Sequence, residues 1–173
     1  VLDALERLAR GDLVPVADMG PVDLVGVVAD AVDAARQRHP HVDVALTATG
    51  GSTVDGWAPG LRVPVANLLD NAAHHGRSAD GAARLEVRVD GDGRETVLRV
   101  RDHGRGLPAD EREAVRGRFV RGRGASGAGS GIGLALVDQQ VRSHGATMGI
   151  GDASGGGCEV TIRLPHGGPP SDG

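Results

Sequence analysis

The stretch that decides the fold is Asn67-Leu68-Leu69-Asp70-Asn71-Ala72-Ala73-His74-His75-Gly76, in the middle of the 173-residue chain. Its apolar residues recur at the spacing of one helical face, which predicts a helix that ends near Gly76. Asn67 and Asn71 are four residues apart and share another face. Asparagine is a poor residue in mid-helix, because its side chain competes for backbone hydrogen bonds. The pair is therefore either a solvated surface or a site for a hard cation such as Mg²⁺, which amide oxygens coordinate.

A second polar cluster, Asp102-His103-Gly104-Arg105-Gly106, follows a predicted strand further along the chain. A carboxylate at a strand end, followed by two glycines, can accept a hydrogen bond from an exocyclic amine while the backbone approaches closely. The same pattern also fits an ordinary glycine-rich turn with a capping aspartate. By itself this cluster leaves both interpretations open.

A third cluster, residues 127–135, has alternating glycines that lead into a predicted helix. Backbone N–H groups and the positive end of a helix can receive phosphate groups. Alternating glycines also occur in dinucleotide-binding loops, but that fingerprint lies between an early strand and a helix. Here the glycines follow a long irregular stretch late in the chain, which argues against a nicotinamide enzyme.

Hydrophobic periodicity predicts helices and strands on both sides of these clusters. Between two of the strands, Asp90-Gly91-Asp92-Gly93 is typical of a hairpin turn. This mixture predicts an α/β fold, a two-layer sandwich in which about three helices cover a mixed, largely antiparallel sheet. Helices are expected over 1–10, 21–38, 61–75, 108–116 and 132–144. Strands are expected over 41–48, 52–57, 84–89, 96–100, 147–150 and 158–164.

Composition excludes several classes of protein. The net charge is −4 and the chain has one Phe, one Trp and no Tyr, which disfavours binding of nucleic acid through phosphates or base stacking. A single cysteine, Cys158, permits no internal disulfide and no multi-cysteine zinc site, and it suits a reducing compartment. No signal peptide is apparent, and no apolar run reaches the roughly 18 residues that a membrane-spanning helix needs.

Taken in order, the clusters resemble those of the ATP-binding domain of sensor histidine kinases. This domain shares the Bergerat fold with gyrase, heat-shock-chaperone and MutL-type ATPases. In this resemblance Gly155–Pro165 corresponds to the closing glycine-rich turn and strand. The asparagine, first glycine, phenylalanine and second glycine boxes correspond to Asn67–Gly76, Asp102–Gly106, Arg118-Phe119-Val120-Arg121 and Gly129–Leu134, respectively.

The resemblance implies ATP and Mg²⁺ as cofactors and assigns roles by position. Asn71 would coordinate Mg²⁺, with Asn67 supporting the phosphates or the metal. Asp102 would accept from the adenine amino group, and Thr161 would assist at the adenine through water. Arg121 would reach the γ-phosphate. The other implied nucleotide-binding residues are His74, His75, Gly104, Gly106, Gly129, Gly131, Gly133 and Leu134.

Two of these residues depart from the family's usual pattern. His74 and His75 stand where the family often has Lys and Tyr. A histidine can donate to a phosphate or stack on a base, with a charge that depends on pH. The alternative is an ordinary polar helix end. A metal site made by the two neighbours is disfavoured, because adjacent helical residues point about 100° apart.

Asn67 indicates the branch of the superfamily. Relatives that hydrolyse ATP, and anti-sigma-factor kinases that phosphorylate serine, resemble each other in carrying a Glu general base at this position. An asparagine cannot accept a proton there, whereas a neutral imidazole acceptor has a free lone pair and needs less help. The resemblance therefore implies a histidine kinase with Asn67 and Arg121 as catalytic residues. The alternatives are an anti-sigma-type serine kinase and a non-catalytic nucleotide-sensing module.

The resemblance also implies a domain organisation and partners. Residues 1–12 would end the dimerisation and phosphoacceptor helix, and residues 13–166 would form the kinase domain, with a lid loop over about 107–131. Residues 167–173 would be a flexible tail. None of the seven His begins a His-[Glu/Asp]-x-x-[Thr/Ser/Asn]-Pro acceptor motif. The acceptor His is therefore expected on a missing upstream dimerisation domain, and this chain is expected to be inactive alone.

A response regulator receiver domain would take the phosphoryl group onward in a bacterial two-component system. The full-length protein is expected to be a membrane-anchored homodimer with this domain in the cytoplasm. Neither nucleic acid nor the membrane is expected to contact the segment itself.

Overall fold

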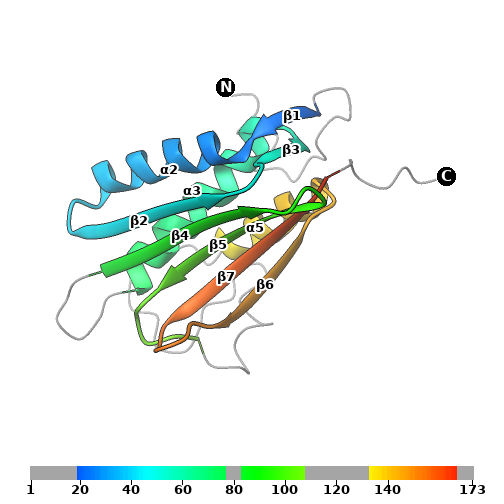
Figure 1. Cartoon of the computed structure of the whole chain (residues 1–173). Coiled ribbons are helices and arrows are strands. Elements are labelled where there is room, and N and C mark those ends of the chain that lie inside the picture. Colours follow the sequence, from blue (N-terminus) through cyan, green and yellow to red (C-terminus); the bar gives the residue numbers. More distant parts are fainter. Residues whose placement is uncertain (1–18, 77–82, 108–132, 167–173) are drawn as a thin grey trace.

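The computed structural model of the chain describes residues 19–76, 83–107 and 133–166 (Figure 1). The helices expected over 1–10 and 108–116, nearly all of the lid loop and the tail lie outside these ranges. The described helices are α2 (Leu24–Arg38), α3 (Ala58–His75) and α5 (Gly133–Ser143). The described strands are β1 (Gly20–Asp23), β2 (Val42–Thr49), β3 (Thr53–Gly56), β4 (Ala83–Gly91), β5 (Glu95–Asp102), β6 (Thr147–Asp152) and β7 (Cys158–Pro165).

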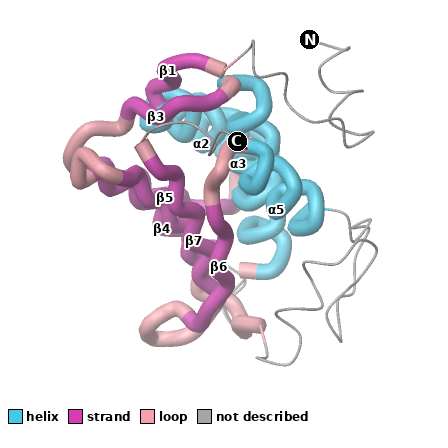
Figure 2. Tube along the Cα trace, turned by 90° about the vertical axis from the view of Figure 1, so that its right-hand side faces the viewer, coloured by secondary structure: helices cyan, strands magenta, loops and turns pink. Residues whose placement is uncertain are grey.

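Five strands form the main sheet, in the order β2-β4-β5-β7-β6. Strands β2 and β4 are parallel, and the other three neighbouring pairs are antiparallel. Figures 1 and 2 show that α2, α3 and α5 lie together on one face of this sheet. The prediction of a two-layer α/β sandwich with a mixed, largely antiparallel sheet is therefore confirmed.

The core lies between the helices and the inner face of the sheet. Alternate residues of β4 are buried, with Glu86 and Arg88 exposed between them, as a strand with one covered face requires. Aliphatic side chains fill the core. Both layers contribute fully buried apolar side chains, among them Leu24, Val28, Leu69, Leu85, Leu98 and Val137. None of the described helices is both long and apolar enough to cross a membrane.

The first described helix begins at Leu24 and not at Pro21, so the predicted start was wrong. Pro21 lies in β1, which pairs with β3 in a separate two-stranded sheet that the sequence did not predict. The Asp23 carboxylate caps α2 by accepting from the Val25 N–H at 3.1 Å, and it also accepts from the Ser52 hydroxyl at 2.8 Å. These hydrogen bonds, chiefly that from Ser52, lower the pKa of Asp23. An aspartate N-cap thus determined the boundary in place of the proline.

Helix α3 begins three residues earlier than predicted. Pro59 lies in its first turn, where a missing N–H costs little. Because the helix begins earlier, Pro64 lies inside it. The end of α3 agrees with the prediction, because Gly76 donates its N–H to the Ala72 carbonyl and closes the last turn.

Candidate functional site

Asp102 ends β5 on the face of the sheet that the helices cover, and its side chain is buried. Its Oδ1 accepts from the backbone N–H of Gly104 at 2.9 Å and from that of Cys158 at 3.1 Å. Within the described ranges no donor is bonded to Oδ2. Two N–H groups therefore fix the carboxylate in one orientation and leave its second oxygen to accept from a ligand.

Three glycines bring separate segments against Asp102. A Cβ on Gly76, at the end of α3, would lie 2.6 Å from the Asp102 Cβ. A Cβ on Gly104 would lie 2.4 Å from the His75 carbonyl oxygen, and one on Gly157 would lie 1.9 Å from the Asp102 carbonyl oxygen. No side chain fits at such distances, so glycine is required for this close approach. The structure thus joins the ends of α3 and β5 with the β6–β7 turn.

We call the close packing of Gly76, Gly104 and Gly157 around Asp102 the glycine cradle. A substitution at Gly157 tests this packing directly. It has a φ of 96°, which L side chains rarely adopt, and a Cβ there would overlap the Asp102 carbonyl. Gly157→Ala is expected to lower the free energy of unfolding by about 2 kcal/mol or more, measured by chemical denaturation. Gly149→Ala is the matched control in β6, where a Cβ would meet no atom within 4 Å. Equal stability of the two variants would contradict the described packing.

Asn67 and Asn71 lie half-buried on α3, while Leu68 and Leu69 between them are buried in the core. Neither amide makes a hydrogen bond to another described residue. Among the described residues no group of three or more His, Cys, Asp or Glu could hold a metal ion. A cation at Asn71 would therefore need oxygen ligands from a bound phosphate and from water, which matches the way Mg²⁺ is usually held.

His74 and His75 are adjacent in sequence but lie in different surroundings. The His74 ring lies 5.3 Å from that of His39, edge to face, and its Nδ1 is 2.7 Å from the Asp70 carbonyl oxygen. His75 keeps an exposed surface, yet loss of water around its ring lowers its pKa, helped by His74 and Arg105 and opposed by Asp102. His75 is thus electrostatically linked to Asp102, and its lowered pKa favours the neutral imidazole.

Thr161 does not lie beside Asp102 and the glycines packed around it. Its expected role at the adenine is therefore corrected. Side chains alternate along β7: Val160 and Ile162 are buried beneath the helices, which leaves Thr161 on the outer face. There its hydroxyl faces Glu159. Cys158, three residues before Thr161, packs against the core on the same face as Asp102. The sequence pattern did not single out Cys158, Gly76 or Gly157 as site residues, although each lies within a segment that the resemblance identified.

The remaining predicted residues lie near the ends of elements. Gly106 has a φ of 72°, and a Cβ on it would lie 3.0 Å from the Gly157 carbonyl oxygen. Gly133 begins α5, and Leu134 packs against the core. The other three predicted residues, Arg121, Gly129 and Gly131, lie outside the described residues.

Comparisons with known proteins agree with this architecture. Residues 56–168 match the family described as histidine kinase-, DNA gyrase B- and HSP90-like ATPases. The chain is 38% identical to the sensor-type histidine kinase PrrB of Mycobacterium tuberculosis, over 95% of the chain and 36% of PrrB. It is 35% identical to the histidine-protein kinase/phosphatase MprB of Mycolicibacterium smegmatis, again over 95% of the chain and 36% of that relative. The chain thus spans about a third of the length of these relatives.

Solved structures give the same result. A mycobacterial sensor histidine kinase MprB structure has a TM-score of 0.73 and 35% identity, covering 84% of this chain and 96% of that one. The ATP binding domain of PrrB from Mycobacterium tuberculosis has a TM-score of 0.72 and 29% identity, covering 87% of this chain and 98% of that one. The chain therefore belongs to the family of histidine kinase-, DNA gyrase B- and HSP90-like ATPases, as an ATP-binding catalytic domain of the sensor histidine kinase type.

Proposed function

We propose that this chain binds ATP with Mg²⁺ and donates the γ-phosphate to a histidine on an upstream dimerisation domain. From there the phosphoryl group would pass to an aspartate of a response regulator receiver domain. The observation that carries this proposal is the buried Asp102 carboxylate, held by two backbone N–H groups inside a cradle of glycines. The sensor histidine kinases named above support the proposal, and none of them favours the serine-kinase alternative.

The adenine would be recognised by Asp102. Its Oδ2 would accept a hydrogen bond from the exocyclic amino group, and the charge on the carboxylate would strengthen that bond. Gly104 and Gly106 would let the loop backbone approach the base. His75, which is electrostatically linked to Asp102, would lie at the rim of this pocket, whereas His74 would stay with His39.

The phosphates would extend from the adenine toward α3 and the beginning of α5. Asn71 would offer its amide oxygen to Mg²⁺, and Asn67 would support the phosphates or the metal. Gly133 begins α5, where backbone N–H groups and the helix dipole favour an anion. The glycines at 129 and 131 would extend this phosphate-binding backbone.

Phosphoryl transfer requires positioning and electrostatic stabilisation more than covalent chemistry by the protein. When bound, ATP supplies the phosphoryl group and Mg²⁺ neutralises the charge on its oxygens. Arg121 would reach the γ-phosphate and stabilise negative charge in the transition state. Asn67 would orient groups without accepting a proton, because the neutral acceptor imidazole already carries a lone pair. A general base is therefore unnecessary at position 67.

The same proposal covers the rest of the protein. Residues 1–12 would end the dimerisation helix, residues 13–166 would form the kinase domain with its lid, and 167–173 would be a tail. The full-length protein would be a homodimer anchored in the membrane, with this domain in the cytoplasm. The sensor kinases to which the chain is similar, of which it spans about a third, support this arrangement.

Calorimetric titration of the 173-residue chain with ATP tests the proposal. Binding is expected with Mg²⁺ present and is expected to weaken when Mg²⁺ is chelated, because Asn71 then loses the cation that links it to the phosphates. A thermal-unfolding scan should show a higher Tm with ATP than without, since a ligand that binds only the folded state stabilises it. If no adenine nucleotide produces heat or a shift in Tm, the chain does not have this function.

A further inference from the structure

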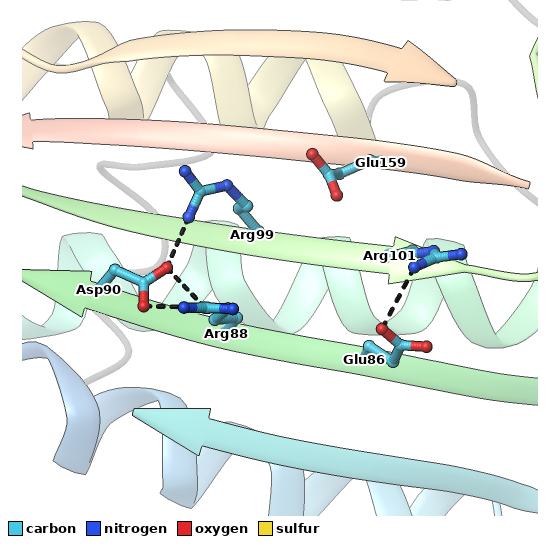
Figure 3. Close-up of a pocket in the computed structure, with 6 residues that line it drawn as sticks. All are labelled: Glu86, Arg88, Asp90, Arg99, Arg101 and Glu159. Carbon is cyan, nitrogen blue, oxygen red and sulfur yellow. Dashed lines mark hydrogen bonds and ion pairs between the residues drawn. The ribbon is translucent and has the colours of Figure 1, made fainter. Parts of the chain in front are cut away.

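A network of charged side chains lies on the outer face of the sheet, behind Asp102. This face holds a hollow of about 400 Å³ that is lined by three arginines and three acids (Figure 3). Asp102 is not among the lining residues, so the hollow is distinct from the proposed nucleotide site. Figure 3 shows ion pairs between neighbouring strands, including that of Arg101 on β5 with Glu86 on β4. The lining residues are Glu86, Arg88, Asp90, Arg99, Arg101 and Glu159.

Arg101 is the most buried of the three arginines that line this hollow. Its side chain is 19% exposed, compared with 33% for Arg99 and 59% for Arg88. Its Nη1 lies 3.4 Å from the Glu86 Oε2, and its Nη2 donates to the backbone carbonyl of Ser154. Its Nε is buried and has no acceptor among the described residues. A buried N–H without an acceptor costs free energy, and the Nε could regain a hydrogen bond by moving into water. The other contacts of Arg101 therefore keep its side chain in this position.

Ser154 belongs to the glycine-rich turn between β6 and β7. Gly155, Gly156 and Gly157 follow it with φ values of 88°, 101° and 96°. Three successive residues with positive φ lose much conformational freedom when the turn forms. The Arg101 bond to Ser154 anchors the beginning of this turn, and the end of the turn supplies the Cys158 N–H that Asp102 Oδ1 accepts.

Glu86 contacts both residues that flank Asp102 in the sequence, Arg101 and His103. Its Oε2 pairs with Arg101, and its Oε1 lies 2.8 Å from the His103 Nε2. Arg101 and His103 are the residues immediately before and after Asp102. Glu86 thus contacts the side chains of the residues on both sides of the buried carboxylate, while Arg101 contacts the turn that donates to it.

We infer that Arg101, paired with Glu86, is a positioning residue for Asp102. By anchoring the Ser154–Gly157 turn from the outer face, it keeps the Cys158 N–H on Oδ1 and leaves Oδ2 directed at the ligand. It therefore sets the preference for a base that carries an exocyclic amino group without touching the nucleotide. This inference rests on the proposed adenine site.

The experiment compares the affinity for ATP with that for inosine triphosphate, which has an oxygen in place of the adenine amino group. In Arg101→Gln the ATP affinity is expected to fall roughly tenfold, while the inosine triphosphate affinity changes less than about twofold. The matched control is Arg99→Gln, on the same face of the same strand, where Arg99 pairs with Asp90 at 2.6 Å. This control is expected to leave both affinities within about twofold of wild type.

Amide hydrogen exchange gives a second readout that needs no nucleotide. The Cys158 N–H is expected to exchange faster in Arg101→Gln than in Arg99→Gln, because the anchored turn then opens more often. If Arg101→Gln does not fold, Glu86→Gln takes its place with the same expected directions. Equal exchange in the variant and its control would overturn the inference.

Asp102→Asn, measured in the same titrations, separates failure of the inference from failure of the proposed function. If Asp102→Asn loses the preference for ATP and Arg101→Gln keeps it, Arg101 has no positioning role although the adenine site stands. If Arg101→Gln weakens both nucleotides equally, its role is structural and the inference is wrong. If wild type does not prefer ATP to inosine triphosphate, the adenine site and the inference both fail.

Discussion

Asp102→Asn is expected to weaken ATP binding by roughly 10- to 100-fold, which corresponds to the ~1.5–3 kcal/mol of a charge-assisted hydrogen bond. The amide is neutral, and it has only one oxygen for the groups that the carboxylate now serves. If that oxygen keeps the Gly104 and Cys158 N–H groups, the amide NH₂ faces the adenine amino group and two donors oppose each other. Calorimetric titration of both proteins with ATP and Mg²⁺ measures the loss.

Asp43→Asn is the matched control for this change. Asp43 is exposed on the outer face of β2, two strands from β5 in the sheet order, and its replacement removes the same charge. ATP affinity is expected to stay within about twofold of wild type, because an exposed charge on the outer face of the sheet is largely screened by water and salt. Comparable losses in the two variants would show that net charge, and not recognition by Asp102, governs binding.

Much of the fold could be predicted because it depends on patterns that are local in sequence. Alternation along 84–89 identified β4 and its buried face, and the hairpin turn at 90–93 paired it with β5. Asp102 could be singled out as a candidate binding residue because a strand end and two glycines lie beside it and because the ordered clusters resemble those of sensor histidine kinases. These signals extend over a few residues, so strand period and turn chemistry suffice to read them.

What the sequence did not reveal depends on contacts between distant segments. Whether Cys158 or Thr161 faces Asp102 is set by the strand register, and a one-residue difference exchanges the two faces. His74 and His75 look equivalent in the sequence, but only the packing of α2 against α3 shows that His74 meets His39. The anchoring of Ser154 by Arg101 joins residues 53 positions apart, and no local pattern encodes it.

Phosphoryl transfer is expected only in a longer protein in which the dimerisation helices bring an acceptor His to the nucleotide. The 173-residue chain alone is expected to show no autophosphorylation and very slow ATP hydrolysis, because Asn67 cannot act as a general base and positioning supplies much of the barrier reduction. In the longer protein, Asn71→Asp is expected to slow transfer by about 100-fold or more. Incorporation of radiolabelled phosphate from ATP measures both effects.

The physical reason for this effect is charge beside the phosphates. Aspartate keeps the size of Asn71 but adds a negative charge to the proposed metal-ligand set, which repels the γ-phosphate oxygens and changes how Mg²⁺ is shared with them. Gln37→Glu, an amide-to-carboxylate change at an exposed position of α2, is the control and should transfer at the wild-type rate. Both variants should unfold at nearly the wild-type temperature, because neither amide lies in the core. Phosphate on one of the chain's own seven histidines, or rapid hydrolysis by the chain alone, would place it in another branch of the family.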